Sequence, residues 1–273
     1  MLYDDFLLKC ENLNISYNDD RSTIKVLNDI NFILKKNFIL GIVGESGCGK
    51  STVAKAITGI LPENAVVSGR ILFDKFDLLN CTKKDRDIIR GNEISMVFQE
   101  PSIVLNPARK IKHQFFDILG KKDLNEVKKR LSEVQLENVK NVVEMYPYQL
   151  SGGMKQRSVI AMAISKYPKI LIADEPTSAL DSEIRKKIVK LLVDLKNVYN
   201  MSLIYISHNI SEVEKICNDI LIMKNGNLIE YGSTAEIMNN PKEEYTVSLI
   251  KASKRDWNDW NKEYLQNLQV KSL

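Results

Sequence analysis

A cluster of glycines and polar residues near position 45 has the types and spacing that bind phosphate. The segment GESGCGKST fits the pattern GxxxxGK[ST] at Gly44, Gly49, Lys50 and Ser51. Glycines let the backbone wrap closely around an anion, and successive N–H groups complement its charge. Lys50 would add a point charge for the β- and γ-phosphates, and the Ser51 hydroxyl is the expected Mg²⁺ ligand. We expect the whole loop to contact a nucleotide, through Gly44, Glu45, Ser46, Gly47, Cys48, Gly49, Lys50, Ser51 and Thr52.

Two adjacent carboxylates follow a second apolar segment. Asp174 and Glu175 come directly after Lys169–Ala173 (KILIA) and before Pro176. Ligands of open α/β sheets bind at the carboxyl ends of the strands, where the first carboxylate would reach Mg²⁺ and the second the attacking water. An isolated Asp-Glu pair before proline is more often a solvated turn, but the phosphate loop in the same chain favours the metal and water roles.

One of the chain's two histidines stands at the end of a third apolar segment. Ser202–Ile206 (SLIYI) leads into Ser207 and His208. A lone histidine is usually structural or exposed, but this one ends a parallel-strand candidate on the same sheet edge as the other two motifs. We therefore expect His208 at the γ-phosphate.

A second glycine cluster precedes a run with helical periodicity. This cluster lies in the sequence LSGGMKQR, residues 150–157, which we call the signature segment. Ser151 is a good helix N-cap, and Gly152 and Gly153 expose backbone N–H groups at the positive end of the helix. One nucleotide does not need two phosphate sites in one chain. We therefore interpret this anion site as serving a nucleotide bound mainly by another subunit.

Short apolar segments must position these groups. Asn37–Val43 (NFILGIV) is rich in β-branched residues and is typical of a strand buried on both faces, and the residues after the phosphate loop have helical character. With Lys169–Ala173 and Ser202–Ile206 as further strands, the pattern predicts an α/β core of buried parallel strands.

Composition sets limits on the class of protein. The chain has 273 residues, of which 44% are hydrophobic and 27% charged, and its formal net charge is +4. This charge is too small to favour nucleic acid or an anionic membrane surface as a partner. The apolar runs fall far short of the roughly 20 residues of a membrane-spanning helix. The first residues lack the pattern of a secretory signal, and the four cysteines are scattered, so we expect free thiols in a reducing cytosol.

The combination of motifs resembles one family. LSGGMKQR between a GxxxxGKS loop and ILIADEP is similar to the signature of the ATP-binding-cassette (ABC) ATPases, and the resemblance runs from about Phe6 to about Ile250. It implies a P-loop ATPase core with a parallel sheet, an amino-terminal antiparallel β region and an inserted helical subdomain at approximately 101–148. The ABC ATPase domain would then span 1–250, and 251–273 would be a short carboxy-terminal extension.

The resemblance also assigns roles to single residues. Tyr17 matches the aromatic that stacks on adenine, and Gln99 the glutamine that reaches towards Mg²⁺ and the water. The turn Ser178–Asp181 (SALD) matches the one that contacts the partner subunit. The implied catalytic residues are Glu175, His208, Gln99 and Lys50. The implied Mg²⁺ ligands are Ser51, Gln99 and Asp174. In the signature segment, the implied nucleotide contacts are Ser151, Gly152, Gly153 and Gln156.

Two further stretches resemble the peptide and nickel importer branch of this family. They are EPSIVLNPARKIKHQ, with matches at Asn106, Pro107 and Gln114, and NPKEEYTVSLI, with matches at Pro241, Tyr245, Thr246 and Leu249. The resemblance implies an ATP-hydrolysing subunit, peripheral on the cytoplasmic face of the cell membrane. Its partners would be a second ABC ATPase subunit, identical or different, two membrane permease subunits and an extracellular substrate-binding protein, with no nucleic acid. The cargo would be a peptide, nickel or a metal chelate.

Two other functions stay open at this point. One is an ABC-type export ATPase, against which the LNP and terminal patterns argue. The other is a DNA-repair-type ABC ATPase, which would interrupt its core with long heptad-rich coiled coils. Only about 120 residues separate Lys50 from Asp174, without sustained heptads.

Two departures from the family pattern and one stretch near the carboxyl end each lead to a separate expectation. Cys48 stands where serine is frequent, which predicts sensitivity to thiol reagents. Asn209 follows His208 where aspartate is common, which predicts looser positioning of the histidine. Trp257, Trp260 and Tyr264 form one helical stripe, which favours a short helix folded back on the domain.

Overall fold

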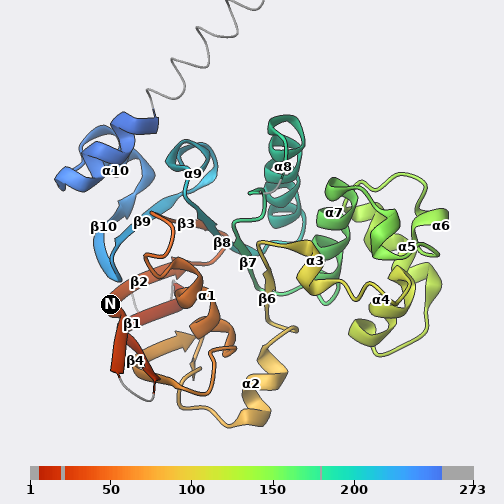
Figure 1. The fold of residues 1–273 in the computed structure, drawn as a ribbon, viewed down its shortest axis with the longest axis horizontal. Coiled ribbons are helices and arrows are strands. Elements are labelled where there is room, and N and C mark those ends of the chain that lie inside the picture. Colours follow the sequence, from red (N-terminus) through yellow and green to blue (C-terminus); the bar gives the residue numbers. More distant parts are fainter. Residues whose placement is uncertain (1–5, 20–21, 179, 254–273) are drawn as a thin grey trace, which may run out of the picture.

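One ten-stranded sheet runs through the computed structural model, which describes residues 6–19, 22–178 and 180–253 (Figure 1). Its strand order is β5-β4-β1-β2-β10-β9-β3-β8-β7-β6. The strands are β1 Phe6–Asp19, β2 Ser22–Lys35, β3 Ile39–Gly44, β4 Ala65–Phe73, β5 Phe76–Asp77, β6 Ile94–Val97, β7 Ile170–Asp174, β8 Ser202–Ser207, β9 Asp219–Lys224 and β10 Asn227–Ser233.

The amino-terminal part of the sheet is antiparallel, as predicted. Strand β1 pairs antiparallel with both β2 and β4, and β4 pairs with β5. Register shifts interrupt the β1–β2 ladder, so that these long strands twist strongly along their length. Strand β2 joins the rest of the sheet through a single parallel pairing, of Asn28 with Asn227 in β10.

Parallel strands form the centre of the molecule. Strand β3 lies between β8 and β9, and β7 lies between β8 and β6, all in parallel pairing. The three strands predicted from the apolar segments are therefore β3, β7 and β8. Strand β3 begins two residues later than predicted, because Lys36 and Asn37 form a turn in which Asn37 has a φ of 61°. The carboxyl ends of these strands meet at one edge of the sheet.

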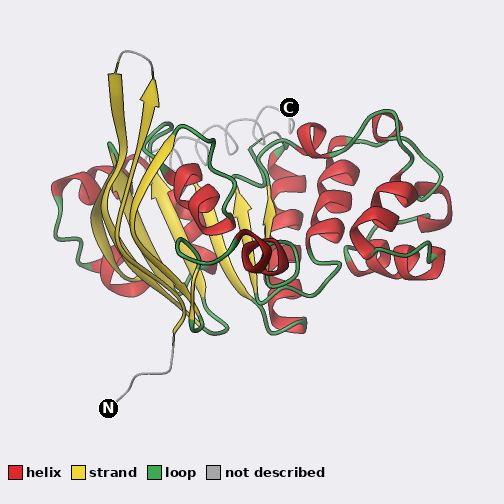
Figure 2. Cartoon of the chain, turned by 90° about the horizontal axis from the view of Figure 1, so that it is seen from below, coloured by secondary structure: helices red, strands yellow, loops and turns green. Residues whose placement is uncertain are grey.

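Helices cover the parallel strands and extend to one side of them. In Figure 2 the strands gather at one side and most helices at the other. The helices are α1 Lys50–Thr58, α2 Lys83–Ile89, α3 Pro101–Val104, α4 Ile111–Leu119, α5 Leu124–Glu133, α6 Val139–Val142, the 3-10 helix Pro147–Gln149, α7 Gly152–Ala163, α8 Ser182–Val198, α9 Ile210–Ile216 and α10 Thr234–Asn239. Between β6 and β7 the chain is helical without strands, which is the region of the predicted helical subdomain; its limits at 101 and 148 stay a prediction.

Side chains of β7 and β8 alternate between two apolar cores. Leu171 and Leu203 pack with residues of α4, α5, α7 and α8, whereas Ile172 and Ile204 pack with α1 and the antiparallel strands. Because both faces of the parallel strands are covered, their sequences are apolar throughout instead of alternating. In the part of the chain that the structure describes, no helix is long and apolar enough to span a bilayer.

A helical segment over residues 244–253 ends the described part of the chain. The Glu230 carboxylate in β10 holds its start, because its two oxygens accept hydrogen bonds from the backbone N–H groups of Lys242 (3.0 Å) and Glu243 (3.3 Å). Trp257, Trp260 and Tyr264, with most of the predicted extension 251–273, lie outside the described residues.

Candidate functional site

The phosphate loop joins β3 to α1, as its motif predicts. Gly49 precedes α1 with a φ of 104°, and Gly47 has a φ of 81°, backbone conformations that side chains rarely permit. A Cβ atom on Gly49 would lie 2.5 Å from Leu27 Cδ2, and one on Gly44 would collide with the carbonyl oxygen of Met223. Glycine at both positions lets the loop fold tightly against its neighbours.

Lys50 lies inside this loop. Its side chain is 4% exposed, and its Nζ donates hydrogen bonds to the carbonyl oxygens of Gly44 (2.9 Å) and Glu45 (2.8 Å). The same atom lies 3.8 Å from Glu175 Oε1. The structure thus places the predicted phosphate-binding charge between the glycine loop and the predicted catalytic carboxylate.

Ser51 and Asp174 form the predicted metal-binding pair. The Ser51 hydroxyl donates a hydrogen bond of 3.0 Å to Asp174 Oδ1, which brings together groups 123 residues apart. Burial raises the pKa of the Asp174 carboxyl, and the neighbouring Glu175 charge adds to this effect. The hydrogen bond from Ser51 and the charges of Lys50 and Lys55 act in the opposite direction.

This pair fits a magnesium ion. Within the described ranges no cluster of three or more His, Cys, Asp or Glu residues could hold a metal on its own. Mg²⁺ commonly takes one or two carboxylates together with substrate phosphates and water, and does not need an all-protein cage. A hydroxyl beside a buried carboxylate, next to a phosphate loop, is the donor set that this mode of binding requires.

Glu175 is the point at which the predicted catalytic residues meet. Gln99 Nε2 lies 3.4 Å and His208 Nδ1 3.3 Å from Glu175 Oε2, and Lys50 lies near its other oxygen. Glu175 itself has a φ of 44°, and its backbone N–H donates a hydrogen bond to Ile206 O at 3.0 Å. This left-handed conformation is uncommon for residues other than glycine, and such strained residues cluster at functional sites.

His208 is exposed, but the backbone after it is fixed. The N–H of Asn209 donates a hydrogen bond to Ser207 Oγ (3.0 Å), and the Asn209 side chain caps α9 by accepting from the N–H of Ser211 (3.0 Å). The expectation that Asn209 loosens the histidine is therefore not supported by the geometry.

The signature segment begins α7, as predicted. Ser151 is the N-cap residue, and its hydroxyl accepts a hydrogen bond of 3.3 Å from the N–H of Met154. Ser151 and Gly152 are exposed, whereas Gly153 is buried. The Gln156 side chain is 1% exposed, so it is buried in the structure of the single chain. This burial argues against direct contact between Gln156 and a nucleotide at the helix end.

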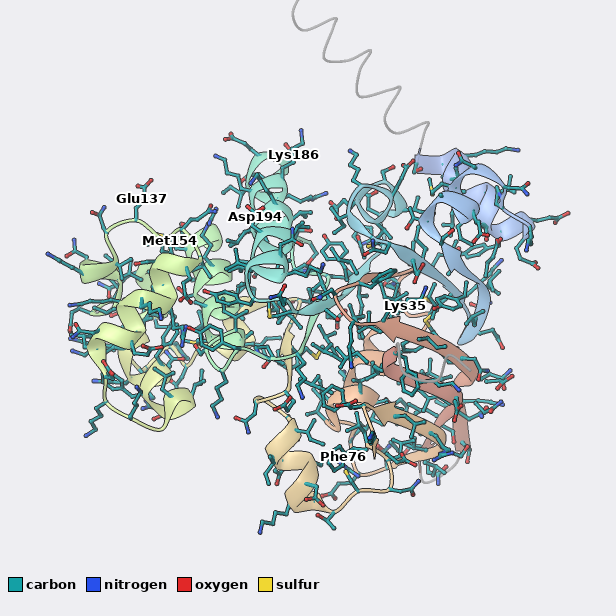
Figure 3. The ribbon with its side chains drawn as sticks, turned by 180° about the vertical axis from the view of Figure 1, so that it is seen from behind. Lys35, Phe76, Glu137, Met154, Lys186 and Asp194 are labelled. Carbon is teal, nitrogen blue, oxygen red and sulfur yellow. The ribbon has the colours of Figure 1, made fainter. Side chains whose placement is uncertain are left out.

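The two anion sites of the chain lie apart. Figure 1 shows α7 among the helices on one side of β6 and β7, and α1 on the other side of these strands. Met154, in the first turn of α7, lies in the same helical region as Glu137 (Figure 3). A single phosphate group within one chain therefore does not occupy both sites.

Tyr17 lies near the end of β1. It is half-buried and stands opposite Ile24 in β2 and Ala65 in β4. Ile24 is well exposed, so this end of the antiparallel strands offers an apolar surface. Stacking of adenine on Tyr17 stays a prediction.

Cys48 does not have the environment of a reactive thiol. Its side chain is 4% exposed, and burial raises the pKa of the thiol. This environment argues against the predicted thiol sensitivity, because the thiol is buried and burial favours its protonated form. The expectation of free thiols is confirmed, since Cys10, Cys48, Cys81 and Cys217 are all unpaired.

The sequence analysis missed a group of polar residues behind His208. Arg185 in α8, Tyr205 and Ser207 in β8, and Glu212 in α9 contact one another there. One signal was available, because Glu212 stands four residues after His208 at the start of a helix. The pairing with Arg185 had no local signal.

Comparison with known proteins agrees with this geometry. The model of a family described as "ABC transporter" matches residues 27–178. Among curated relatives, the oligopeptide transport ATP-binding protein OppD of Haemophilus influenzae is 38% identical over 266 residues, which cover 95% of this chain and 82% of OppD. The metal-staphylopine import system ATP-binding protein CntD of Staphylococcus aureus is 36% identical over 91% of this chain and 94% of CntD.

Two solved structures are similar. The structure of cbiO1 from Clostridium perfringens, described as part of the ABC transporter complex cbiONQ, has a TM-score of 0.73 at 31% identity and covers 87% of this chain and 92% of cbiO1. The ATP-binding cassette MJ0796, a dimer in a post-hydrolysis state bound to ADP and Pi, has a TM-score of 0.72 at 26% identity, with coverage of 83% and 98%.

Proposed function

Since this chain belongs to the ABC transporter family of ATPases, we propose that it is the ATP-hydrolysing subunit of an importer for peptides or metal chelates. The observation that carries the catalytic part is the convergence of Lys50, Gln99 and His208 on Glu175, beside the Ser51–Asp174 pair. The segments that follow β3, β6, β7 and β8 supply these groups at one sheet edge.

Each residue has a separate task in hydrolysis. Glu175 orients the attacking water and accepts its proton, and Gln99 and His208 hold the Glu175 carboxylate and the transferring phosphoryl group. Lys50 and the backbone N–H groups of the loop balance the negative charge that spreads over the phosphoryl oxygens. Ser51, Asp174 and Gln99 would hold Mg²⁺, which when bound would neutralise negative charge on the phosphates.

A second ATPase subunit completes the site. Because α7 and α1 lie apart in one chain, Ser151, Gly152 and Gly153 would contact the ATP bound at the loop of a partner, head to tail. Closure of the two subunits on ATP and reopening after hydrolysis would transmit force to two permease subunits at the cytoplasmic face of the membrane. An external substrate-binding protein would deliver the cargo.

A cavity offers a place for the permease. It has a volume of about 490 Å³ and lies between the residues of β6 and those of α3, α4 and α7. Its walls include Phe98, next to Gln99, and Val104, beside the exposed Ile103. A permease segment in this cavity would contact the chain one residue away from a group that touches Glu175.

The relatives narrow the class of cargo. The name of OppD refers to oligopeptide transport, and the name of CntD refers to metal-staphylopine import. The permease and the binding protein select the cargo in such a system. Comparing uptake of a labelled short peptide with that of a labelled nickel chelate, with and without this chain, tests the two classes.

Substitution of Glu175 by glutamine tests the catalytic proposal. Glu175→Gln should lower the steady-state rate of ATP hydrolysis about 100-fold or more while ATP still binds, because the amide does not accept the water proton. Glu183→Gln, on the exposed side of α8, is the matched control and should leave hydrolysis unchanged. Intact hydrolysis in Glu175→Gln would overturn the proposed role.

Copurification tests the transport part. Recovery of the chain with integral membrane subunits is expected, and recovery with DNA or ribosomes in their place would contradict it.

A further inference from the structure

Four side chains behind His208 form a polar cluster that hydrolysis, as derived above, does not use. The members of this Glu212 cluster are Arg185, Tyr205, Ser207 and Glu212. The Tyr205 hydroxyl donates a hydrogen bond of 2.9 Å to Glu212 Oε2, and the Ser207 hydroxyl donates one of 3.4 Å to the same oxygen. Arg185 Nη1 lies 3.7 Å from Glu212 Oε1. Three elements, α8, β8 and α9, are joined through one carboxylate.

One end of the Glu212 cluster reaches the turn that is predicted to contact the partner subunit. Arg185 Nη2 donates a hydrogen bond of 3.3 Å to Leu180 O, in the turn 178–181. The same turn ends at Asp181, which caps α8 by accepting from the N–H groups of Glu183 (3.1 Å) and Ile184 (2.9 Å). A displacement of this turn therefore acts directly on the Arg185 guanidinium.

The other end reaches the catalytic carboxylate. Ser207 Oγ donates to Glu212 and accepts from the N–H of Asn209, so the cluster holds the backbone on both sides of His208. His208 Nδ1 in turn lies 3.3 Å from Glu175 Oε2. A continuous chain of contacts thus runs from Leu180 through Arg185, Glu212 and Ser207 to the residue that touches Glu175.

The surroundings strengthen these contacts. Tyr205 is fully buried, and burial together with the Glu212 charge raises the pKa of its phenol. Arg185 Nε is buried without a hydrogen-bond partner among the residues described. Charges and hydrogen bonds in such a partly dry setting are stronger than on an open surface.

The space beside the cluster is too small for a ligand. It has a volume of about 10 Å³ and is lined by residues of the turn, of β8 and of α9, with Glu175 and His208 at one side. This volume corresponds to at most one water molecule. The cluster therefore has no room for a substrate, and its role lies in holding its neighbours in place.

We propose that Arg185 and Glu212 are positioning residues that hold Leu180 and Asp181 in place relative to His208, so that hydrolysis depends on how the partner subunit contacts the chain there. This inference rests on the proposed function. Neither residue touches the phosphate loop. Their loss should therefore slow the chemical step and leave ATP binding intact.

A double-mutant cycle on the full chain, assayed in the complex with which it copurifies, tests the inference. Arg185→Ala and Glu212→Gln should each lower kcat for ATP about tenfold, with KM within about twofold of the wild type. The double variant should be no slower than the slower single variant, because the two residues act as one unit. Lys187→Ala, which removes an exposed pair with Glu183 on the same helix, is the control and should not change kcat.

Two milder variants separate positioning from a general loss of structure. Arg185→Lys keeps the charge opposite Glu212 and should recover part of the lost rate. Tyr205→Phe removes only the hydroxyl that donates to Glu212 and should lower kcat several-fold at an unchanged KM. Thermal midpoints of all variants should stay close to that of the wild type.

Three results would overturn the inference. They are unchanged kcat in both single variants, losses that multiply independently in the double variant, and a loss of rate that follows a fall in thermal midpoint. No hydrolysis by the wild-type complex would overturn the proposed function as well. Hydrolysis by the wild type with unaffected variants would overturn this inference alone.

Discussion

At the scale of single residues, the site contains groups that destabilise the isolated chain but that the proposed chemistry needs. Asp174 is the clearest example, because burial raises the pKa of its carboxyl. Between the pKa values of the unfolded and folded states the native chain binds more protons. Its stability therefore falls as the pH rises through this interval, and the penalty is greatest above the pKa of the folded state.

Asp174→Asn should stabilise the chain in the absence of Mg²⁺ and nucleotide. The amide oxygen still accepts the Ser51 hydrogen bond, and the buried charge is gone. At neutral pH a gain of about 1 kcal/mol would raise the thermal midpoint by about 2–4 °C. The gain should disappear in acid, as the pH falls towards the unfolded pKa of aspartate.

Thermal unfolding at several pH values measures this effect. Asp194→Asn, which removes an exposed carboxylate paired with Lys190 on α8, is the control and should show no such pH dependence. Equal stability of Asp174→Asn and wild type at neutral pH would contradict the prediction.

Thiol reactivity is a second property set by single residues. Cys10, Cys48 and Cys217 are buried, and burial raises the pKa of each thiol, that of Cys10 to about 12. Cys81 is half-buried. A chromogenic disulfide reagent should therefore react rapidly with one thiol of the native chain, and ATP hydrolysis should persist after that reaction.

Variants identify the fast thiol. Cys81→Ser should abolish the fast phase, and Cys48→Ser should leave it in place. If Cys48→Ser, and not Cys81→Ser, protected ATP hydrolysis from the reagent, the thiol of Cys48 in the phosphate loop would have to be accessible.

The sequence predicted the site residues that sit in short motifs, and missed those that depend on tertiary contacts. Lys50 and Glu175 were predictable because each motif contains its own strand end, and parallel strand ends share one edge. Arg185 and Glu212 were not predictable, because their meeting depends on how α8 and α9 pack across β8. The side chains of Cys48 and Gln156 are buried, and no local sequence pattern indicates this burial.

At the scale of elements, close packing of α9 on β3 fixes the position of the helix that follows His208. A Cβ atom on Gly41 would lie 2.9 Å from Cys217 Sγ and closer still to Val213 Cγ1. Gly41 in the middle of β3 therefore lets α9, which follows His208, approach the strand. Any side chain at this position would move the helix outward.

Gly41→Ala should destabilise the chain by about 1–3 kcal/mol and lower hydrolysis, because the added methyl group overpacks this contact. Combining it with Val213→Ala should cost less than the sum of the two single changes, by about 0.5–3 kcal/mol, since the smaller side chain makes room. Denaturant unfolding of the four proteins gives these values.

Gly232→Ala is the matched control, because a Cβ there meets no atom closer than 3.5 Å. It should be nearly neutral. Additive effects of Gly41→Ala and Val213→Ala would show that α9 does not press on β3 through this pair.

Element prediction succeeded where one short segment carries the signal. The apolar segments before each motif became β3, β7 and β8, and the Ser151 cap begins α7. The offset at the start of β3 comes from the turn at Asn37, whose positive φ no apolar pattern specifies. The parallel pairing of β2 with β10 joins Asn28 to Asn227 and had no sequence signal, because residues so far apart share no motif.

At the scale of the whole molecule, the fold separates the phosphate loop from the signature segment. The phosphate loop follows β3, Asp174 ends β7 and Glu175 comes directly after it. The capped end of α7 lies among the helices on the other side of β6 and β7 from α1 (Figure 1). In the function proposed above, each chain would bind its nucleotide at the phosphate loop and hydrolyse it when a second subunit closes over the γ-phosphate. Hydrolysis would then depend on closure, which would couple ATP to movement of a permease.

This division predicts that binding and hydrolysis respond differently to Ser151→Arg. The bulky cation would block the partner's nucleotide, so ATP hydrolysis by the complex should fall about tenfold or more. ATP affinity at the loop of the same chain should stay within about twofold of the wild type, because Ser151 does not contact that loop. Ser132→Arg, which places the same side chain at an exposed position of α5, controls for charge and should leave both quantities unchanged. Weaker binding of ATP by the isolated Ser151→Arg chain would mean that α7 serves the nucleotide of its own chain, and the head-to-tail arrangement would have to be abandoned.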